Sequence, residues 1–212
     1  MSCRNYFIEP VRSSAILTTG YVAGTVIDGG AGVGVHENNQ LELIVDFTIG
    51  SLTSLELKVE TSPYKIVYTQ AYDGQTANFT VGERIRGNTS GVEATVLADS
   101  DSGATGTLTL IDYKPSASHS VFLDNETIRG TSSGVAVVNG ARAEATTYWY
   151  QTTTTSASGG TITVYSAEYT RTASGQFRLS VPIKDRYIKV SAKGTGTVTN
   201  SLCAISAIVG QV

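Results

Sequence analysis

Two stretches of the sequence nearly repeat each other: residues 82–96 read GERIRGNTSGVEATV, and residues 126–138 read ETIRGTSSGVAVV. At a constant offset of 43 residues the coinciding positions are Phe79/Phe122, Glu83/Glu126, Ile85/Ile128, Arg86/Arg129, Gly87/Gly130, Ser90/Ser133, Gly91/Gly134 and Val92/Val135. The repeat predicts one unit that occurs twice: an apolar start, a tight turn at Thr-Ser-Gly or Ser-Ser-Gly, and a Val-rich returning strand. Because one hairpin alone is marginal in water, we expect the two hairpins to cover each other's apolar side.

The residues around the repeat define the predicted domains. Between the two copies, residues 94–113 read as another hairpin that turns between Asp99 and Gly106. Residues 62–146 are therefore predicted to form a small β domain of their own. The flanking strand patterns, 1–61 and 147–212, read as two parts of one larger sandwich, so the repeat domain is predicted to be an insertion whose two ends lie close together.

Outside the insertion the strand signal is alternation. Leu41, Leu43, Val45 and Phe47 fall on one face of a predicted strand, and the last third of the chain repeats this pattern several times. No stretch sustains an apolar stripe with helical spacing over three turns. The sequence predicts an all-β protein: a discontinuous, jelly-roll-like β-sandwich with the inserted domain. Pro182 interrupts a good strand pattern, so we expect that strand at a sheet edge.

Composition argues against several classes of function. Net charge is −3 with no basic block, so the sequence predicts no binding to nucleic acid or to an anionic membrane. No apolar run approaches the ~20 residues of a membrane span, and the start has no apolar leader. A disulfide between Cys3 and Cys203 is compatible with ends that meet, but two reduced thiols fit a chain made in a reducing cytosol better.

Chemistry-bearing residues are sparse. The two histidines, His36 and His119, lie in polar stretches typical of loops, and neither sits beside a nucleophile in the sequence. Asp99 and Asp101 suggest calcium ligation, but the acidic residues that an EF-hand adds are missing, so a turn is the favoured interpretation. The glycine cluster at 28–34 lacks the pattern of a phosphate-binding loop and is interpreted as a loop or arm. We expect no catalytic residue, no metal and no cofactor.

Three groups of residues remain as candidates for binding. Tyr148-Trp149-Tyr150 has the chemistry to stack on sugars or bases, but alternation favours a core Trp149 between two surface tyrosines. Arg86 and Arg129, equivalent in the two repeats, are candidate interface residues, or simply surface arginines paired with nearby acids. The start Tyr6-Phe7-Ile8 is either an arm that docks on a neighbour or a first strand.

The repeated pattern F-x-x-G-E-x-I-x-G-x-x-S-G, from Phe79 to Gly91 and more loosely from Phe122 to Gly134, resembles repeats in structural proteins of tailed bacteriophages. The second copy departs from it by having Asn125 where the first has Gly82. The outer segments, LTSLELKVETS, YWYQ and DRYIKVSAKGTGTVTNSLCAISAIVG, are similar to a β-sandwich protein of the phage virion. Together these segments cover more than half of the chain.

The resemblance implies a non-enzymatic virion protein, first of all a capsid decoration (cement) protein that stabilises the phage head as a symmetric homo-oligomer. Its expected partners are the major capsid protein and copies of itself, and its expected location is the virion, assembled in the bacterial cytoplasm. The alternatives are a tail, baseplate or fibre component that contacts host surface glycans, and a carbohydrate-binding module. An enzyme, either an esterase or a glycosidase, is the least favoured alternative. A glycosidase would need two carboxylates that meet across a cleft.

Overall fold

A computed structural model describes residues 6–28, 40–151, 155–158, 161–164, 168–182 and 185–210. These residues contain β-strands and no helix, and every strand pairing among them is antiparallel. The prediction of an all-β protein is confirmed. The chain divides into two compact units: Met1–Lys65 with Trp149–Val212, and Ile66–Tyr148. The unit boundaries thus lie at 65/66 and 148/149, whereas the sequence predicted 61/62 and 146/147.

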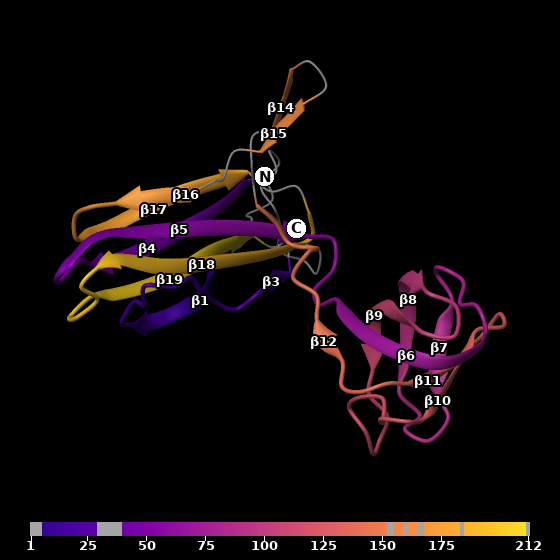
Figure 1. The fold of residues 1–212 in the computed structure, drawn as a ribbon. Coiled ribbons are helices and arrows are strands. Elements are labelled where there is room, and N and C mark those ends of the chain that lie inside the picture. The colour runs from indigo at the N-terminus through magenta and orange to yellow at the C-terminus, as the bar shows by residue number, and fades with distance from the viewer. Residues whose placement is uncertain are drawn as a thin grey trace, which may run out of the picture. The chain divides into compact units, whose positions relative to one another are not determined.

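The first unit is a sandwich of two sheets (Figure 1). One sheet has the strand order β1-β19-β4-β17, with bounds Tyr6–Ala15, Leu202–Gly210, Gln40–Thr48 and Gly175–Pro182. The other has the order β13-β5-β18-β2, with bounds Tyr150–Gln151, Leu52–Ser62, Tyr187–Gly196 and Val22–Ala23; in addition β16 (Glu168–Arg171) pairs with β5, and β3 (Ile27–Asp28) pairs with β18. A separate pair joins β14 (Thr155–Ser158) to β15 (Thr161–Val164).

The chain passes from one sheet to the other as it moves along the sandwich. It crosses from β1 to β2 and β3, back to β4 and across to β5, remains in that sheet for β13 and β16, and then crosses at each step from β16 to β17, β18 and β19. With β2 and β3 together in one position, and β13 and β16 in another, the eight positions follow the order of a jelly roll, which is two interlocked Greek keys. The jelly-roll-like sandwich is confirmed. Strand β17 lies at a sheet edge and ends at Pro182, so the predicted edge position of this strand is confirmed.

The sandwich core follows from the alternation seen in the sequence. Side chains of β4, β5, β18 and β19 that point inward form one buried cluster, which includes Leu43, Leu57, Val190 and Ile205. Residues between them, such as Asp46, point to solvent. Period-2 alternation therefore places each strand's apolar side against the opposite sheet.

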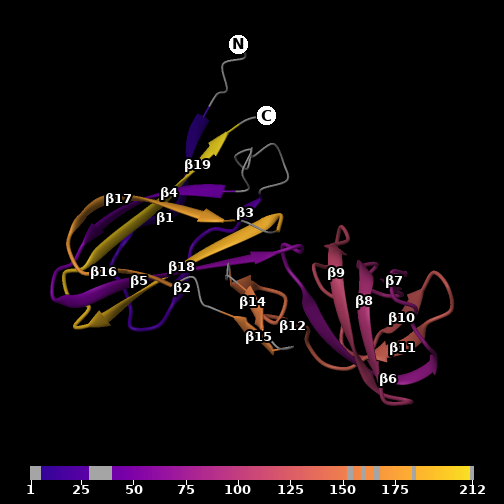
Figure 2. The ribbon, with the colours of Figure 1, turned by 90° about the horizontal axis from the view of Figure 1, so that it is seen from above.

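The second unit is a closed barrel. Its strand order is β11-β10-β7-β8-β9-β6, and β11 also pairs with β6. The bounds are β6 Tyr68–Ala77, β7 Arg84–Gly87, β8 Glu93–Asp101, β9 Gly106–Lys114, β10 Thr127–Gly130 and β11 Val135–Val138. Figure 2 looks onto these strands. The barrel has its own apolar core, which includes Tyr72, Ile85, Leu108 and Ile128.

The chain enters and leaves the barrel through paired segments. Within the barrel unit, β12 (Ala143–Glu144) pairs with the start of β6, and the N–H of Ala145 donates to the carbonyl of Val67. Within the sandwich unit, β13 pairs with the last residues of β5. In each unit the incoming and outgoing chain thus run side by side, which is the geometry that an inserted domain requires.

We expected the two repeated hairpins to cover each other's apolar side, but they do not pack face to face. They lie side by side, because β7 and β10 pair directly, with Ile85 opposite Gly130 and Ile128 opposite Gly87. An approximate twofold axis therefore passes between Arg86 and Arg129, which are opposite each other. Closure of the barrel buries the apolar faces that an open pair of hairpins would leave exposed.

The offset of 43 residues ends at the hairpin turns. Ile85 pairs with Ala94 and Ile128 pairs with Ala136, so the returning strands correspond at an offset of 42. The second turn is one residue shorter: Gly87 donates to the carbonyl of Val92, whereas Gly130 donates to the carbonyl of Gly134. The sequence equivalences Ser90/Ser133, Gly91/Gly134 and Val92/Val135 are therefore wrong as structural equivalences, and Gly134 takes the buried place of Val92.

Residues with positive φ shape both a strand and the turns of the barrel. Asp73-Gly74 lies inside β6, where Gly74 has φ 54° and two extra residues bulge opposite β11. The bulge lets β6 leave β9 and pair with β11, which closes the barrel. At the start of the two repeats, Gly82 and Asn125 both have positive φ, 88° and 63°, so the departure at Asn125 keeps the same turn.

Candidate functional site

A buried glutamate of each repeat binds the hairpin turn of the other. Glu126 is 5% exposed, and its carboxylate accepts hydrogen bonds from the backbone N–H groups of Thr89 at 3.0 Å and Ser90 at 2.8 Å, both in the first repeat. It also accepts one from Leu123 in its own repeat at 2.7 Å. One side chain thus satisfies three N–H groups that β-strands leave unpaired.

Glu83 makes the reciprocal arrangement. Its carboxylate accepts from the N–H of Thr80 in its own repeat at 2.6 Å and from the N–H of Ser132 in the second repeat at 2.9 Å. Each carboxylate crosses the seam between β7 and β10 and ties the two hairpins together. The repeated Glu is therefore a structural residue of the barrel.

The repeated glycines make room for these carboxylates. A Cβ on Gly87 would lie 2.6 Å from Oε1 of Glu126, and one on Gly130 would overlap Oε2 of Glu83. Both carboxylates are held by backbone hydrogen bonds and have little freedom to move away. The spacing G-E-x-I-x-G thus encodes a lock in which the glycine of one repeat receives the glutamate of the other.

The lock makes the stability of the barrel depend on pH. Burial opposes ionisation of Glu126, but the hydrogen bonds from Ser90, Leu123 and Thr89 outweigh it, so the pKa of Glu126 lies below its ordinary value of 4.5. A lowered folded-state pKa stabilises the folded form fully above that ordinary value, and the stabilisation is lost as pH falls through the folded-state pKa.

We therefore expect the barrel to lose stability as the pH is lowered below about 4.5. Hydrogen exchange of the barrel amides in the intact chain, followed between pH 6 and pH 3 or so after correction for the intrinsic rate, measures the loss. Glu126→Gln should flatten this dependence. An equally steep pH dependence in the Glu126→Gln variant would contradict the prediction.

The predicted interface residues Arg86 and Arg129 lie opposite each other on β7 and β10. Both are exposed, because their neighbours Ile85 and Ile128 point into the core. Among the described residues neither arginine forms an ion pair, so the prediction that each pairs with a nearby acid is wrong. The ion pair on this face joins Nε of Arg84 to Oε2 of Glu93 at 3.0 Å.

These residues belong to a basic surface that we call the arginine face. It consists of Arg84, Arg86, Arg129 and Lys114, with Glu93 as the acid in its row and exposed Asp112 two residues before Lys114 on β9. Strand pairing puts Lys114, Glu93, Arg86 and Arg129 in one row across β9, β8, β7 and β10. Arg84 lies two residues before Arg86 on β7 and so shares its outward side.

The predicted N-terminal candidates Tyr6, Phe7 and Ile8 are the first residues of strand β1. They pair with Gly210, Val209 and Ile208 of β19, so of the two alternatives the structure has the first strand. Strand β1 is the edge of its sheet, and Ile8 is 61% exposed. Edge strands of this kind offer unpaired backbone groups to a partner.

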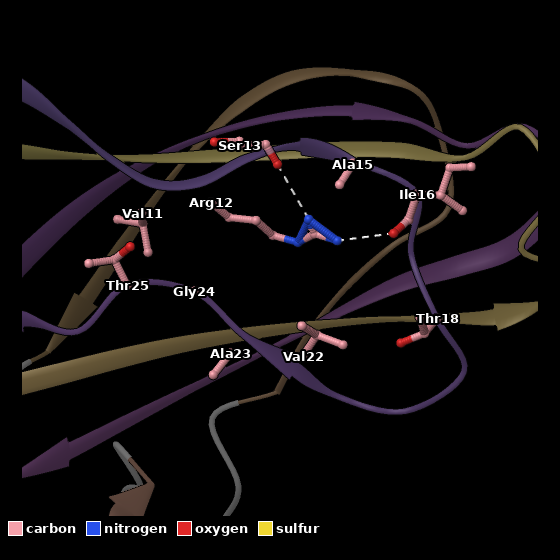
Figure 3. A pocket seen from close by; sticks show the side chains of 10 residues that line it. All are labelled: Val11, Arg12, Ser13, Ala15, Ile16, Thr18, Val22, Ala23, Gly24 and Thr25. Atoms are coloured by element: carbon pink, nitrogen blue, oxygen red, sulfur yellow. Dashed lines mark hydrogen bonds between the residues drawn. The ribbon is translucent and has the colours of Figure 1, made fainter. Parts of the chain in front are cut away.

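A groove of about 600 Å³ runs along this open side of the sandwich, between β1 and β2 (Figure 3). Arg12 lies across it and donates to the carbonyls of Ser13, Ile16 and Cys203 at 3.1–3.4 Å. Its Nε is buried and has no hydrogen-bond partner among the described residues. Exposed Ile16 and Val22 line the rim. Arg12 holds the irregular end of β1 in place through backbone carbonyls.

The other sequence candidates have ordinary structural roles. Asp99 accepts a hydrogen bond from the Tyr72 hydroxyl at 2.8 Å, and Asp101 accepts from the N–H of Gly103 at 2.6 Å, which is an aspartate turn. His119 is partly buried in a loop held by Ser116. His36, Cys3 and residues 29–34 of the glycine cluster lie outside the described residues. Across the part of the chain that the structure describes, no group of three or more His, Cys, Asp or Glu is placed to hold a metal ion.

Trp149 is half-buried and does not belong to the apolar core, so the prediction of a core Trp149 is wrong. The ammonium group of Lys189 lies 4.3 Å from the centre of its ring. Lys189 also pairs with Glu60, which in turn pairs with Lys58. Trp149 is thus part of a charged surface of the β5–β18 sheet, where a cation covers one face of the ring.

Cys203 is a free, fully buried thiol in β19. Burial raises its pKa to about 11. We expect Cys203 to resist a thiol reagent such as DTNB at neutral pH in a Cys3→Ser variant, and to react at once in denaturant. Reaction of the folded variant at the rate of a free thiol would contradict this prediction.

Comparisons with known proteins add little to the geometry. No protein-family model matches the chain, and no curated protein matches it. A solved structure of the Gx strain of infectious bursal disease virus aligns over 99% of this chain at 12% identity and a TM-score of 0.12, which carries no argument. This chain spans 40% of the length of that one. The described part of the chain contains no helix long and apolar enough to cross a membrane.

Sequence reasoning missed two residues that the fold brings into the sites. Arg12 sits in a plain strand pattern, and nothing in its neighbours signals that it spans a groove. Arg84 precedes the repeated Ile85, but it has no counterpart in the second repeat, where Thr127 stands in its place. Alternation places Arg84 and Arg86 on one side of a strand, and that signal was present but unused.

Proposed function

We propose that this protein is a structural component of a tailed-bacteriophage particle, in the first place a decoration protein of the head. The observation that carries the proposal is the architecture: a jelly roll, a fold used by viral capsid and lectin domains, with a barrel that contains two repeated hairpins inserted between β5 and β13. A fold alone does not determine function, so the repeat's resemblance to phage structural proteins is the second support.

Such a protein acts by adding contacts. A stable interface buries ~1,200–2,000 Å², and a symmetric shell multiplies even modest contacts into avidity. The jelly roll offers the exposed edge strand β1, and the barrel offers the arginine face. Two separate surfaces on two units allow one chain to contact the capsid protein and a neighbouring copy. Contacts across the boundaries of capsomers would oppose the internal pressure of the packaged genome.

Reconstitution on particles tests this proposal. Heads produced by the encoding phage after deletion of this gene are mixed with the purified protein and sedimented. We expect retention on the heads, saturation at a fixed number of copies, and release of DNA at a higher temperature than from undecorated heads. Failure to sediment with heads overturns the decoration proposal, and binding to tails in the same assay favours the tail or baseplate alternative.

The half-exposed Trp149 supports one alternative from another class, a carbohydrate-binding module, because jelly rolls also occur in lectins. Here the ring would stack on a sugar through the face that Lys189 leaves free. Strong, saturable binding to a glycan array that Trp149→Ala abolishes would replace the decoration proposal by this one. Glycan binding that Trp149→Ala leaves unchanged would not replace the decoration proposal.

A further inference from the structure

Positive charge in the barrel is gathered on one face. Residues 66–148 contain five Lys and Arg and nine Asp and Glu, so this unit as a whole is acidic. Four of the five basic residues nevertheless lie on the arginine face: Arg84, Arg86, Lys114 and Arg129. Of the nine acids, Glu93 lies in the same row and exposed Asp112 lies two residues before Lys114 on β9. The other acids with described roles are turned into the barrel seam or into its turns, as Glu83, Glu126 and Asp101 are.

Barrel stability does not account for this arrangement. Arg86 and Arg129 are direct cross-strand neighbours, and like charges directly opposite each other destabilise a sheet. Neither forms an ion pair with any acid that the structure describes, and the nearest one, Glu93, is already bonded to Arg84. Two exposed guanidinium groups at the twofold axis, without a described carboxylate partner, fit a function of binding an anion from outside.

The chemistry of the face favours carboxylates on protein over sugars or bases. Arginine offers a planar fork that matches a carboxylate with two parallel hydrogen bonds. Stacking of sugar rings or bases needs exposed aromatic rings. The barrel's rings with described contacts pack elsewhere: Tyr72, Phe79 and Phe122 in the core, and Tyr68 and Tyr113 against Arg142.

We propose that the arginine face binds an extended acidic segment of a partner protein, with one carboxylate held between Arg86 and Arg129. The spacing supports an extended segment. Same-side residues of a strand lie ~6.7 Å apart, and neighbouring strands lie ~4.8 Å apart. Alternate carboxylates of an extended chain that runs along β7 therefore repeat at the spacing of Arg84 and Arg86. The inference rests on the proposed function in one respect, namely that the partner is a protein.

Binding of a defined peptide tests the inference without any particle. The probe is an eight-residue peptide of alternating Glu and Thr with a fluorescent label, and its neutral control replaces each Glu by Gln. We expect anisotropy to show binding of the acidic peptide to the intact chain at about 20 mM salt, where charges on a surface are weakly screened. The double variant Arg86→Ser/Arg129→Ser should weaken binding about tenfold, the product of two exposed ion pairs.

The matched control is Arg171→Ser/Arg178→Ser, which removes the same charge from exposed positions of the sandwich. This control should bind as the wild-type chain does, and circular dichroism should show both variants folded. Equal losses in the two double variants, binding of the neutral peptide, or no binding of the acidic peptide would overturn the inference. Tighter binding of polygalacturonate than of the peptide, at equal carboxylate concentration, would overturn it in favour of an anionic polysaccharide. Because no particle takes part, these outcomes are independent of the test on phage heads.

Discussion

Glu126→Ala is expected to lower the free energy of unfolding of the barrel by about 3 kcal/mol. The substitution removes the acceptor of three N–H groups, those of Thr89, Ser90 and Leu123. Each buried N–H left unpaired costs ~1–3 kcal/mol, and water that enters the space recovers part of that loss. The change also releases the first hairpin from the second, so its effect should reach both repeats.

Hydrogen exchange of the intact chain measures this effect at the amides of β7 and β10. Exchange there should quicken by about two orders of magnitude if opening of the barrel limits it. Glu93→Ala is the control, because this acid lies on the outer surface in a partly exposed ion pair and should change stability by less than ~1 kcal/mol. The exchange rate in Glu126→Gln should lie between the rates in Glu126→Ala and Glu93→Ala. If Glu126→Ala exchanges as slowly as Glu93→Ala does, the carboxylate lock is not what holds the repeats together.

Leu43→Ala is expected to destabilise the sandwich by about 3 kcal/mol and to leave the protection of the barrel amides unchanged. Leu43 is fully buried in β4, between Leu179 of β17 and Ala207 of β19. Removal of its side chain leaves a cavity that the flanking strands cannot fill, because their paired backbones hold them apart. The barrel has a separate core, so it shares none of the lost contacts.

The single tryptophan of the chain reports on this change, because Trp149 belongs to the sandwich unit. Fluorescence in a denaturant series should show a lowered midpoint for Leu43→Ala. Asp46→Ala, on the outward side of the same strand, should stay within ~0.5 kcal/mol of the wild-type chain. Faster exchange of the barrel amides in Leu43→Ala would show that the two units unfold together, contrary to this prediction.

Much of the fold follows from local pattern. Alternation over residues 41–47 determines which side of β4 is buried, because successive side chains of a strand point in opposite directions. The same reasoning holds for β5 and β18. Pro182 marks an edge because it cannot donate to a ladder. The repeat at residues 82–96 and 126–138 predicts two hairpins because turn residues and a returning strand occur twice.

What these hairpins do together was decided by tertiary structure. Pairing of β7 with β10, and closure of the barrel by the bulge at Gly74, depend on contacts between distant residues that no local pattern encodes. The repeated glutamates look like surface residues in sequence, since a charged side chain is almost never buried without partners. Their partners are backbone N–H groups of the other repeat, and a one-letter sequence does not show backbone groups.

The arginine face, too, was determined partly by the sequence and partly by the tertiary structure. The sequence by itself determined that Arg86 and Arg129 are equivalent and that each follows a buried isoleucine, because repetition and alternation are local. Only the tertiary structure decided that they lie opposite each other, beside Arg84 and without a carboxylate partner among the described residues. Register between strands is set by the whole barrel, so charges that are 43 residues apart in sequence become direct neighbours.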